Sequence, residues 1–194
     1  MHVIKVRNVH EALPEAIRYL LNNHVLTNSR NGMVLVAPMP VATVYERPRE
    51  RVLFWPVRDA NPFFHFYEAL WMLGGRNDLV SLERFVARMR DFSDNGRTFH
   101  GAYGYRWRRH FGVDQLLEIA DNLLRSPESR RQVLQLWDVA IDLGDQEDKR
   151  DLPCNLVATF QLSAFGALDL VVFNRSNDII WGCYGANAVH FSML

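Results

Sequence analysis

The stretch "DLPCNLVATF", residues 151–160, places a single cysteine between a proline and an apolar run that is typical of a buried strand. A cysteine thiolate is a strong nucleophile, so Cys154 is a candidate for covalent catalysis. Cysteine is also a small hydrophobic residue that proteins bury without giving it any chemistry. The decapeptide alone leaves both interpretations open.

A second candidate is Glu68, the only charged side chain in the run of residues 61–75, "NPFFHFYEALWMLGG". This run predicts a helix that is apolar almost all round, and we therefore expect it to be buried. A carboxylate in a low-dielectric environment has a raised pKa, which suits a general acid or base near neutral pH. The alternative is a glutamate that forms a salt bridge or lies at the rim of the helix.

Arginines mark three places where a phosphate could bind, because guanidinium groups make forked, charge-assisted hydrogen bonds to phosphate oxygens. These are "SPESRR" with Arg130 and Arg131, "FNRSND" with Arg175, Ser176 and Asp178, and "NSRNG" with Arg30. Paired or loop arginines on a solvated surface, and a capping turn at Asp178, are the alternative interpretations.

Composition excludes several classes of function. The 22 basic residues balance 22 acidic ones, so no global charge points to nucleic acid or to a membrane surface. The seven histidines form no cluster with ligand spacing, so we expect no metal site. Cys154 and Cys183 alone make no disulfide framework. No apolar run approaches the ~18 residues of a membrane span, and the start lacks a signal-peptide profile. A reduced, cytoplasmic protein is the default expectation.

The elements that must position these residues follow from hydrophobic periodicity. Helices are expected at residues 10–23, 61–75, 78–92 and 113–125, with Leu13, Ile17, Leu20 and Leu21 on the apolar face of the first. Residues 27–32 are expected to turn, and 33–46 to be extended. Strands are expected at 131–141, 155–164 and 167–175, the last two joined at Phe165 and Gly166. The pattern indicates one mixed α+β domain over residues 1–194 with an antiparallel component.

The last segment, "YGANAVHFSML", has the pattern of the first turns of a helix. It stops without the glycine or cap that usually ends one. We therefore expect the chain to be a fragment of a longer protein, lacking its C-terminal part and inactive or nearly so by itself.

Several of these stretches together resemble the thymidylate synthase family, including its pyrimidine hydroxymethylase branch. "LPCN" followed by "RSNDIIWG" is similar to the family's nucleophile strand and its arginine–serine–x–aspartate motif. "SRR" with "LQLWDV", "YEALWMLGGRND", "GAYGYRW" and "SRNG" resemble further family stretches and occur in family order, from about residue 10 to residue 194. The resemblance implies a thymidylate synthase-like α+β fold whose largely antiparallel sheet packs with helices and mediates dimerisation.

The resemblance also implies a reaction. Cys154 would add to C6 of a pyrimidine nucleoside monophosphate, so that C5 becomes a carbon nucleophile toward the one-carbon unit of 5,10-methylenetetrahydrofolate. The folate is a cosubstrate, and no metal is needed. Glu68 would relay protons, and Tyr103 would help to remove the C5 proton.

The remaining implied roles concern binding. Arg30, Arg175 and Ser176 would hold the phosphate, and Arg130 and Arg131 would reach it across the two-fold axis of a homodimer. The base and the folate would contact the residues Asp178, Gly182, Ala186 and Asn187, with Asp178 on the pterin. The pyrimidine-reading asparagine of the family falls on Ala186 without a gap, or on Asn187 if one residue is inserted.

Departures from the family pattern bear on the product. Asn155 replaces the histidine that methylating members carry after the nucleophile, and Thr159 replaces a glutamine. The segment "RFVARMRDFSDNGRTFHG" lacks the tryptophan pair of methylating members, and large aromatic side chains there would exclude water. These differences slightly favour hydroxymethylation over thymidylate synthesis. Uracil or cytosine as base, and ribose or deoxyribose as sugar, stay open. The rival hypotheses are a non-catalytic nucleotide-binding paralogue and a structural fragment that binds little.

Overall fold

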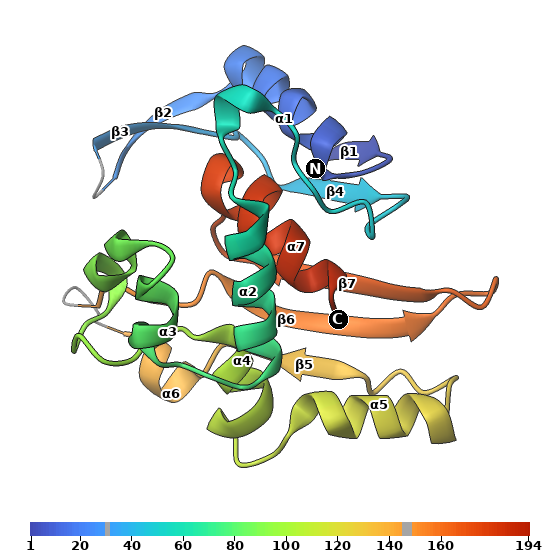
Figure 1. The fold of residues 1–194 in the computed structure, drawn as a ribbon. Coiled ribbons are helices and arrows are strands. Elements are labelled where there is room, and N and C mark those ends of the chain that lie inside the picture. The colour runs from blue at the N-terminus through green and yellow to red at the C-terminus, as the bar shows by residue number, and fades with distance from the viewer. Residues whose placement is uncertain (30–31, 145–148) are drawn as a thin grey trace. The chain divides into compact units, whose positions relative to one another are not determined.

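A computed structural model describes residues 1–29, 32–144 and 149–194 of the chain. The chain divides into two compact units, with unit 1 formed by Met1–Ala69 and Asp178–Leu194 and unit 2 by Leu70–Asn177. The first boundary falls inside helix α2 (Pro62–Leu73), and the second lies just before the last helical segment. Both units mix helices with strands (Figure 1), so the expected α+β class is confirmed.

Unit 1 contains two small sheets and the two ends of the chain. Its other elements are β1 (His2–Val6), α1 (Val9–Asn23), β2 (Val25–Ser29), β3 (Gly32–Val36), β4 (Val41–Tyr45), the short η1 (Pro56–Arg58), η4 (Ile179–Ala186) and α7 (Asn187–Ser192). Strands β1 and β4 pair in parallel, and β2 pairs with β3 in an antiparallel hairpin. Thr27 and Ser29, expected in a turn, therefore belong to a strand.

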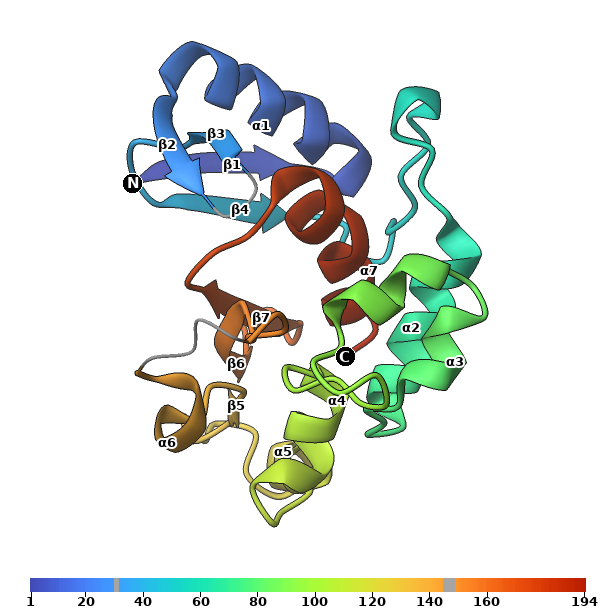
Figure 2. The same ribbon diagram turned by 90° about the vertical axis from the view of Figure 1, so that its left-hand side faces the viewer.

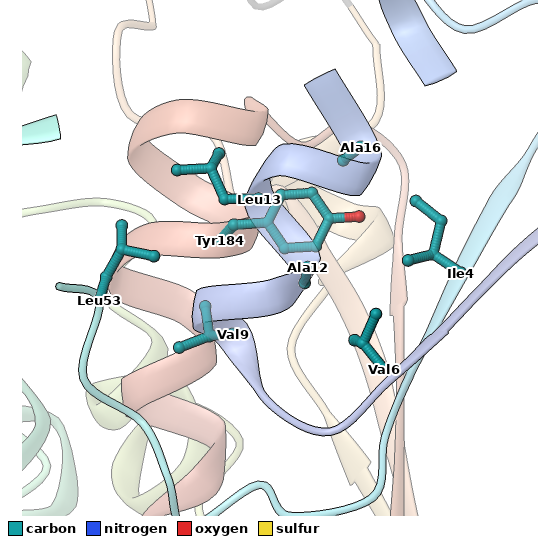
Figure 3. Close-up of a cluster of buried hydrophobic side chains, with 8 residues drawn as sticks. All are labelled: Ile4, Val6, Val9, Ala12, Leu13, Ala16, Leu53 and Tyr184. Atoms are coloured by element: carbon teal, nitrogen blue, oxygen red, sulfur yellow. The ribbon is translucent and has the colours of Figure 1, made fainter. Parts of the chain in front are cut away.

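The core of unit 1 forms where α1 packs on β1 and on the C-terminal helical segment (Figures 2 and 3). It is built from Ile4, Val6, Val9, Ala12, Leu13, Ala16, Leu53 and Tyr184. The spacing of Val9, Ala12, Leu13 and Ala16 gives α1 one apolar face. Leu21, expected on that face, is 59% exposed, because the buried stripe begins one turn earlier than we predicted.

Unit 2 is organised around a three-stranded antiparallel sheet. Its other elements are α3 (Leu79–Glu83), η2 (Ala87–Phe92), α4 (Tyr103–Tyr105), η3 (Arg106–His110), α5 (Gln115–Arg125), β5 (Val133–Gln135), α6 (Val139–Asp142), β6 (Asn155–Leu162) and β7 (Leu168–Asn174). The strand order is β5-β6-β7, and α5 lies beside β5 (Figure 1). The β6–β7 turn contains Gly166 at φ +75°, which confirms the expected hairpin.

The two faces of this sheet differ in burial. Leu134 and its register partner Ala158 are fully buried, and Phe160 lies on the same face. On the opposite face Val133, Val171 and Phe173 are about half exposed. A strand places alternate residues on opposite faces, so the sheet has one face in the core of unit 2 and one apolar face outside it.

A buried ion pair ties the irregular part of unit 2 to the sheet. The Arg106 guanidinium donates to both Asp142 carboxylate oxygens and, at 2.8 Å, to the carbonyl of Leu136 at the end of β5. It also donates to the carbonyl of His100, whose ring nitrogen Nε2 lies 2.8 Å from Asp142 Oδ1. Arg106 and Asp142 are inaccessible to solvent, and their pairing satisfies charges that would be costly to bury alone.

Three further expectations about single elements were wrong. Residues 78–92 form the short α3 and η2 instead of one helix, because the backbone becomes extended at the β-branched Val86 (φ −139°). The strand expected at 131–141 ends at Gln135, since Leu136 N–H and Trp137 N–H share one acceptor, the carbonyl of Leu156, and Asp138 then caps α6.

The third error concerns the burial of α2. Its buried side is the stripe His65, Ala69 and Met72, while Phe63 is 80% exposed and Phe66 49%. A helix that is apolar all round need bury only the side that its chain covers, because apolar atoms make up much of any protein surface.

Candidate active site

The nucleophile candidate lies at the start of β6 in unit 2. Cys154 is half-buried, and its Sγ lies 4.0 Å from the carbonyl oxygen of Leu152. Its own carbonyl accepts a hydrogen bond of 3.0 Å from the backbone N–H of Arg175. The thiol is therefore held at the point where β6 begins and β7 has just ended.

The Arg175 side chain forms hydrogen bonds to the segment that precedes this thiol. Its Nε donates to the carbonyl of Pro153 at 3.0 Å, and Nη2 lies 3.4 Å from the carbonyl of Leu152. The guanidinium carbon lies 5.6 Å from the ring centroid of Trp137. The side chain is exposed, and so is Ser176. The sequence motifs that named Arg175 and Cys154 separately are thus brought together.

Tyr103 belongs to the same group. Its hydroxyl is hydrogen-bonded by the backbone N–H groups of Cys154 and Asn155. Burial raises the pKa of Tyr103, and the neighbouring Cys154 raises it further, so the phenol keeps its proton at neutral pH. A protonated phenol beside a thiol can donate a hydrogen bond to a negative charge that forms there.

A second contact fixes the Tyr103 segment to the nucleophile segment. The Gly101 N–H donates to Asp151 Oδ2 at 2.8 Å. A Cβ at Gly101 would lie 3.0 Å from the Asp151 carbonyl oxygen and 3.1 Å from Pro153 N, so a larger residue would require this backbone to shift by a few tenths of an ångström. Burial raises the pKa of the Asp151 carboxyl, although the Gly101 N–H counteracts part of this rise. Sequence reasoning missed Asp151, which directly precedes "LPC".

The residue after the nucleophile is unusual. Asn155 is 0% exposed, and neither its Oδ1 nor its Nδ2 has a hydrogen-bond partner among the residues that the structure describes. An amide that is buried with both polar atoms unsatisfied costs free energy. In this position the chain holds an uncharged amide, which cannot act as a proton acceptor in the way an imidazole can.

The paired arginines are not part of this group. Arg130 and Arg131 are exposed in the loop between α5 and β5. Within the described ranges, neither has a hydrogen bond or ion pair to the nucleophile segment. Arg30 lies outside the described residues.

Unit 1 contains the other predicted site residues, beginning with Glu68 on α2. The side chain of Glu68 is 15% exposed, and its Oε2 lies 3.0 Å from Nε2 of His190 on α7, which is 5% exposed. One turn before Glu68, burial lowers the pKa of His65 to about 4, with the charges of His190 and Arg58 contributing. Sequence reasoning identified Glu68 but missed His190.

The segment from Asp178 to Asn187 is an irregular helix. Asp178 Oδ1 accepts from the backbone N–H groups of Ile180 (2.9 Å) and Trp181 (2.7 Å). Its carbonyl accepts from Cys183 N–H at 2.7 Å, a π-type turn that accommodates one more residue than an α-turn. The helix is interrupted at Tyr184 and Gly185, after which α7 begins at Asn187. Gly182, Ala186 and Asn187 are half-buried.

Arg58 in unit 1 has no counterpart among the sequence predictions. Its Nε donates to the carbonyl of Ile180 at 2.9 Å, and its guanidinium lies 4.6 Å from the ring centroid of Trp181. A Cβ at Gly185 would lie 2.9 Å from the same carbonyl oxygen and 3.3 Å from Arg58 Nη2. Arg58 therefore stabilises the irregular helix near Gly185, where there is little room for a side chain.

Comparison with known proteins decides the family. The family model described as thymidylate synthase matches residues 16–194. The chain belongs to the thymidylate synthase family. The resemblance inferred from the motifs is thus confirmed.

Curated relatives carry a more specific name. The deoxyuridylate hydroxymethyltransferase of Pseudomonas phage M6 is 61% identical over 194 residues, which is 100% of this chain and 55% of the relative. Proteins of the same name from Bacillus phage SP01 and Delftia phage PhiW-14 are 37% and 30% identical, over 80% and 76% of this chain and 43% of each relative. The chain spans about half the length of these relatives.

A solved structure supports the fold. The crystal structure of thymidylate synthase from T4 phage matches with a TM-score of 0.55 and 23% identity, covering 67% of this chain and 49% of the other. At this identity the likeness shows the fold alone, and the thymidylate synthase-like fold expected from the motifs is confirmed.

Two further observations concern the described part of the chain. It contains no group of three or more histidine, cysteine, aspartate or glutamate side chains arranged to hold a metal ion. None of its helices is both long enough and apolar enough to cross a membrane. The individual site residues named from the sequence stay predictions.

Proposed function

We propose that the protein transfers a one-carbon unit to C5 of deoxyuridylate as a hydroxymethyl group, with 5,10-methylenetetrahydrofolate as cosubstrate. The observation that carries the proposal is the 61% identity, over all 194 residues, with a deoxyuridylate hydroxymethyltransferase. The cluster of Cys154, Tyr103 and Arg175 in unit 2 supports it, because a thiol, a protonated phenol and a phosphate-binding cation are what the first chemical step needs.

In that step the Cys154 thiolate adds to C6 and the electron pair of the C5–C6 bond moves toward the C4 carbonyl. Tyr103 donates a hydrogen bond to the thiolate before it attacks and holds the backbone at Cys154 and Asn155 in place. C5 then bonds to the methylene carbon of the folate as the bond from that carbon to N10 breaks, and N10 takes up the proton released when the Cys154 thiolate formed. The C5 proton is passed to N5 as the second carbon–nitrogen bond breaks, so tetrahydrofolate departs and leaves an exocyclic methylene on C5.

The last step defines the product. Water adds to the exocyclic methylene, a C–O bond forms, and the water loses one proton to a base. The electrons that return from the ring expel the Cys154 thiolate from C6, so no oxidant or reductant is consumed. Glu68 is the carboxylate that we assign to proton transfer in these steps, since it is the nearly buried acid of α2.

For phosphate binding we assign Arg175 and Ser176, together with Arg30. Arg175 uses Nε and Nη2 on the carbonyls of Pro153 and Leu152, and its guanidinium has further N–H donors for an anion. Because Arg130 and Arg131 are exposed, we assign them to the phosphate of a partner subunit in a homodimer. The apolar outer face of the β5-β6-β7 sheet supports such a dimer.

For base recognition we assign Asn187 instead of Ala186. The π-type turn between Asp178 and Cys183 accommodates one extra residue, which is how a helix absorbs a single insertion. With that insertion the family's pyrimidine-reading asparagine falls on Asn187. Its amide can offer a donor and an acceptor to the uracil edge. Asp178 and Gly182 are assigned to the folate side.

Thymidylate synthesis is the second candidate function. The fold of T4 phage thymidylate synthase favours it only at the level of architecture, whereas the relatives with the higher identity are named as hydroxymethyltransferases. A nucleotide-binding paralogue without turnover is less well supported, since Cys154, Tyr103 and Arg175 are grouped as catalysis needs them.

The test uses the natural chain that contains residues 1–194, incubated with deoxyuridylate and methylenetetrahydrofolate. We expect mass spectrometry to identify 5-hydroxymethyldeoxyuridylate, with tetrahydrofolate as the folate product. Formation of a methylated nucleotide with an equal amount of dihydrofolate would instead show thymidylate synthesis. Absence of product together with normal nucleotide binding would support the paralogue.

A further inference from the structure

His190 is a buried histidine that neither the motifs nor the proposed mechanism so far uses. It lies on α7, is 5% exposed, and places Nε2 at 3.0 Å from Glu68 Oε2. The pair is outside hydrogen-bond geometry, and Nδ1 has no hydrogen-bond partner within the described ranges. Contacts of catalytic groups often become well aligned only when substrate is bound.

Both residues of this contact belong to unit 1. Glu68 projects from α2, and α7 is anchored by Arg51, whose Nε donates to Ser192 Oγ at 2.8 Å and whose Nη2 donates to the Ser192 carbonyl at 3.0 Å. Ser192 lies two residues after His190. The position of the imidazole is therefore fixed by the helix and by a hydrogen-bonded arginine.

The other titratable and charged groups around the pair do not compete for this role. His65 lies three residues before Glu68, and burial lowers its pKa to about 4; the Glu68 charge opposes this, and His190 and Arg58 add to it, so His65 is neutral at pH 7. Arg58 is engaged with the Ile180 carbonyl and the Trp181 ring, and Arg51 with Ser192. Glu68 and His190 are the two titratable members of this cluster whose side-chain atoms lie directly against each other.

Hydration makes a demand that hydride transfer does not. When water attacks the exocyclic methylene it must lose a proton, and the acceptor must be a base that is not already protonated. A single carboxylate that takes this water proton stays protonated and must release the proton before the next turnover. A neutral imidazole in contact with that carboxylate can take the proton from it.

We infer that His190 is the proton partner of Glu68. The water proton passes to the Glu68 carboxylate as the C–O bond forms, and from there to His190 Nε2, so that the carboxylate is returned to its ionised form. His190 acts through Glu68 and is a positioning residue in this sense. The inference rests on the proposed function, because only the hydroxymethylating reaction has this step.

The experiment compares the natural chain with its His190→Asn variant, with His24→Asn as the matched control. His24 is an exposed histidine of the same unit, bonded only to backbone carbonyls of α1 in the described structure. Two reactions are measured, namely hydroxymethyl product formation and the covalent adduct of Cys154 with 5-fluorodeoxyuridylate and folate. The adduct reports every step up to carbon–carbon bond formation but not hydration.

We expect His190→Asn to lower kcat for hydroxymethylation by about 10²–10⁴, the range of a lost acid–base catalyst, while adduct formation stays like wild type. His24→Asn should change neither. Retention of hydroxymethylation within about threefold of wild type would overturn the inference. A folded variant that loses the adduct as well would also overturn it, because His190 would then serve an earlier step or the structure.

The pH profile of the wild-type protein tests the inference without a variant that must fold. Both Glu68 ionised and His190 neutral are required, so hydroxymethylation should fall at low pH by the uptake of two protons, while adduct formation should not show the second. The variant His190→Gln should show only one of these two protonation steps. A single-proton limb in wild type would exclude His190. If the wild-type protein yields methylated nucleotide, both the proposed function and this inference fail. If the wild-type protein and the His190→Asn variant form hydroxymethylated nucleotide at the same rate, only this inference fails.

Discussion

At the scale of single residues, backbone groups position the candidate site residues of unit 2 as much as side chains do. The Cys154 and Asn155 amides hold the Tyr103 hydroxyl, and the Gly101 amide holds Asp151. The Arg175 side chain donates hydrogen bonds to the carbonyls of Pro153 and Leu152, the two residues before Cys154. The thiol is thereby fixed between segments that have no freedom to separate without breaking hydrogen bonds.

This arrangement gives a prediction for Cys154→Ser. A hydroxyl is a far poorer nucleophile than a thiolate, so the variant should form no covalent adduct with 5-fluorodeoxyuridylate and should have no measurable turnover. Deoxyuridylate binding, measured by calorimetry, should stay close to wild type because Arg175 and Ser176 are unchanged. The control is Cys183→Ser; burial raises the pKa of that thiol to about 11, so it carries no thiolate at neutral pH and its loss should leave the adduct intact.

Residues with a motif could be named from the sequence, and residues defined by a contact could not. Cys154, Tyr103 and Arg175 each lie in a short stretch whose residue types meet one chemical demand. Asp151 and His190 acquire their positions from partners far along the chain, Gly101 and Glu68. A single sequence has no signal for such pairs, although an acid directly before "LPC" and a histidine in an apolar C-terminal helix were both visible.

At the scale of elements, α4 and its flanking residues must pass very close to α2. A Cβ at Gly104 would overlap the backbone carbonyl of Met72, which accepts a hydrogen bond from the Gly75 N–H at 2.9 Å at the end of α2. We therefore predict that Gly104→Ala destabilises unit 2 by about 3 kcal/mol, the upper end of the usual cost of overpacking. Because Gly104 directly follows Tyr103, we expect the Gly104→Ala variant also to form less covalent adduct at Cys154.

The measurement is urea unfolding followed by circular dichroism. The matched control is Gly74→Ala, where the added Cβ would lie 3.4 Å from the Leu70 carbonyl oxygen, an ordinary contact. Equal midpoints for Gly104→Ala and wild type would show that the α2–α4 approach is looser than described.

The Arg106–Asp142 pair gives a prediction with a defined pH dependence. Burial raises the pKa of Asp142, but hydrogen bonds from Arg106, the Asp138 N–H and His100 outweigh it, so the pKa is lowered in the folded state. Stability from this group is complete above the unfolded pKa of about 3.9 and is lost as the pH falls through the lower folded pKa. Asp142→Asn should cost about 3–5 kcal/mol near pH 7, because Arg106 is left buried without a counter-charge.

The same pair should show itself in acid unfolding. The stability difference between wild type and Asp142→Asn should shrink below about pH 4, where Asp142 of the unfolded chain takes up a proton that the folded chain does not yet bind. Asp121→Asn on α5, an exposed position, serves as control and should change little at any pH. A difference that stays constant down to the pH of unfolding would contradict the ionic role of Asp142.

Elements with strong periodicity were predictable and those set by local backbone geometry were not. Helices α1, α2 and α5 and the β6–β7 hairpin follow from apolar spacing and a turn glycine. The break at Val86 and the short β5 depend on which backbone groups find partners in the sheet. The π-type turn before Asn187 shows the same limit, since the sequence left Ala186 and Asn187 as equal choices.

At the scale of the whole molecule, the balanced charge of the chain means that affinity for a nucleotide phosphate must arise locally. The exposed Arg130 and Arg131 are local cations with no assigned partner in their own unit. The outer face of the sheet in the same unit carries Val133, Thr159 and Val171 in one register row and Val157 and Phe173 in the next. Apolar residues in aligned rows on an exposed sheet are typical of an interface.

The last prediction concerns the exposed arginines and the exposed sheet face together. If the sheet face mediates a two-fold dimer, each site combines Cys154 of one subunit with Arg130 of the other. A heterodimer of Arg130→Ala and Cys154→Ser then has one site with both residues intact and one site with neither. Each variant alone should have little activity at low deoxyuridylate. Mixing them after reversible dissociation should restore about a quarter of the wild-type rate, since half the dimers are mixed and each of these has one intact site.

The control for this experiment is Val171→Asp on the sheet face, which buries a charge in the proposed interface and should leave the chain monomeric by analytical ultracentrifugation. Adding it to both variants should abolish the recovery. Mixtures that contain heterodimers by native mass spectrometry but regain no activity would show that each subunit uses only its own arginines. Recovery that survives Val171→Asp would move the interface away from the sheet, because the complementation requires two subunits whichever surface joins them.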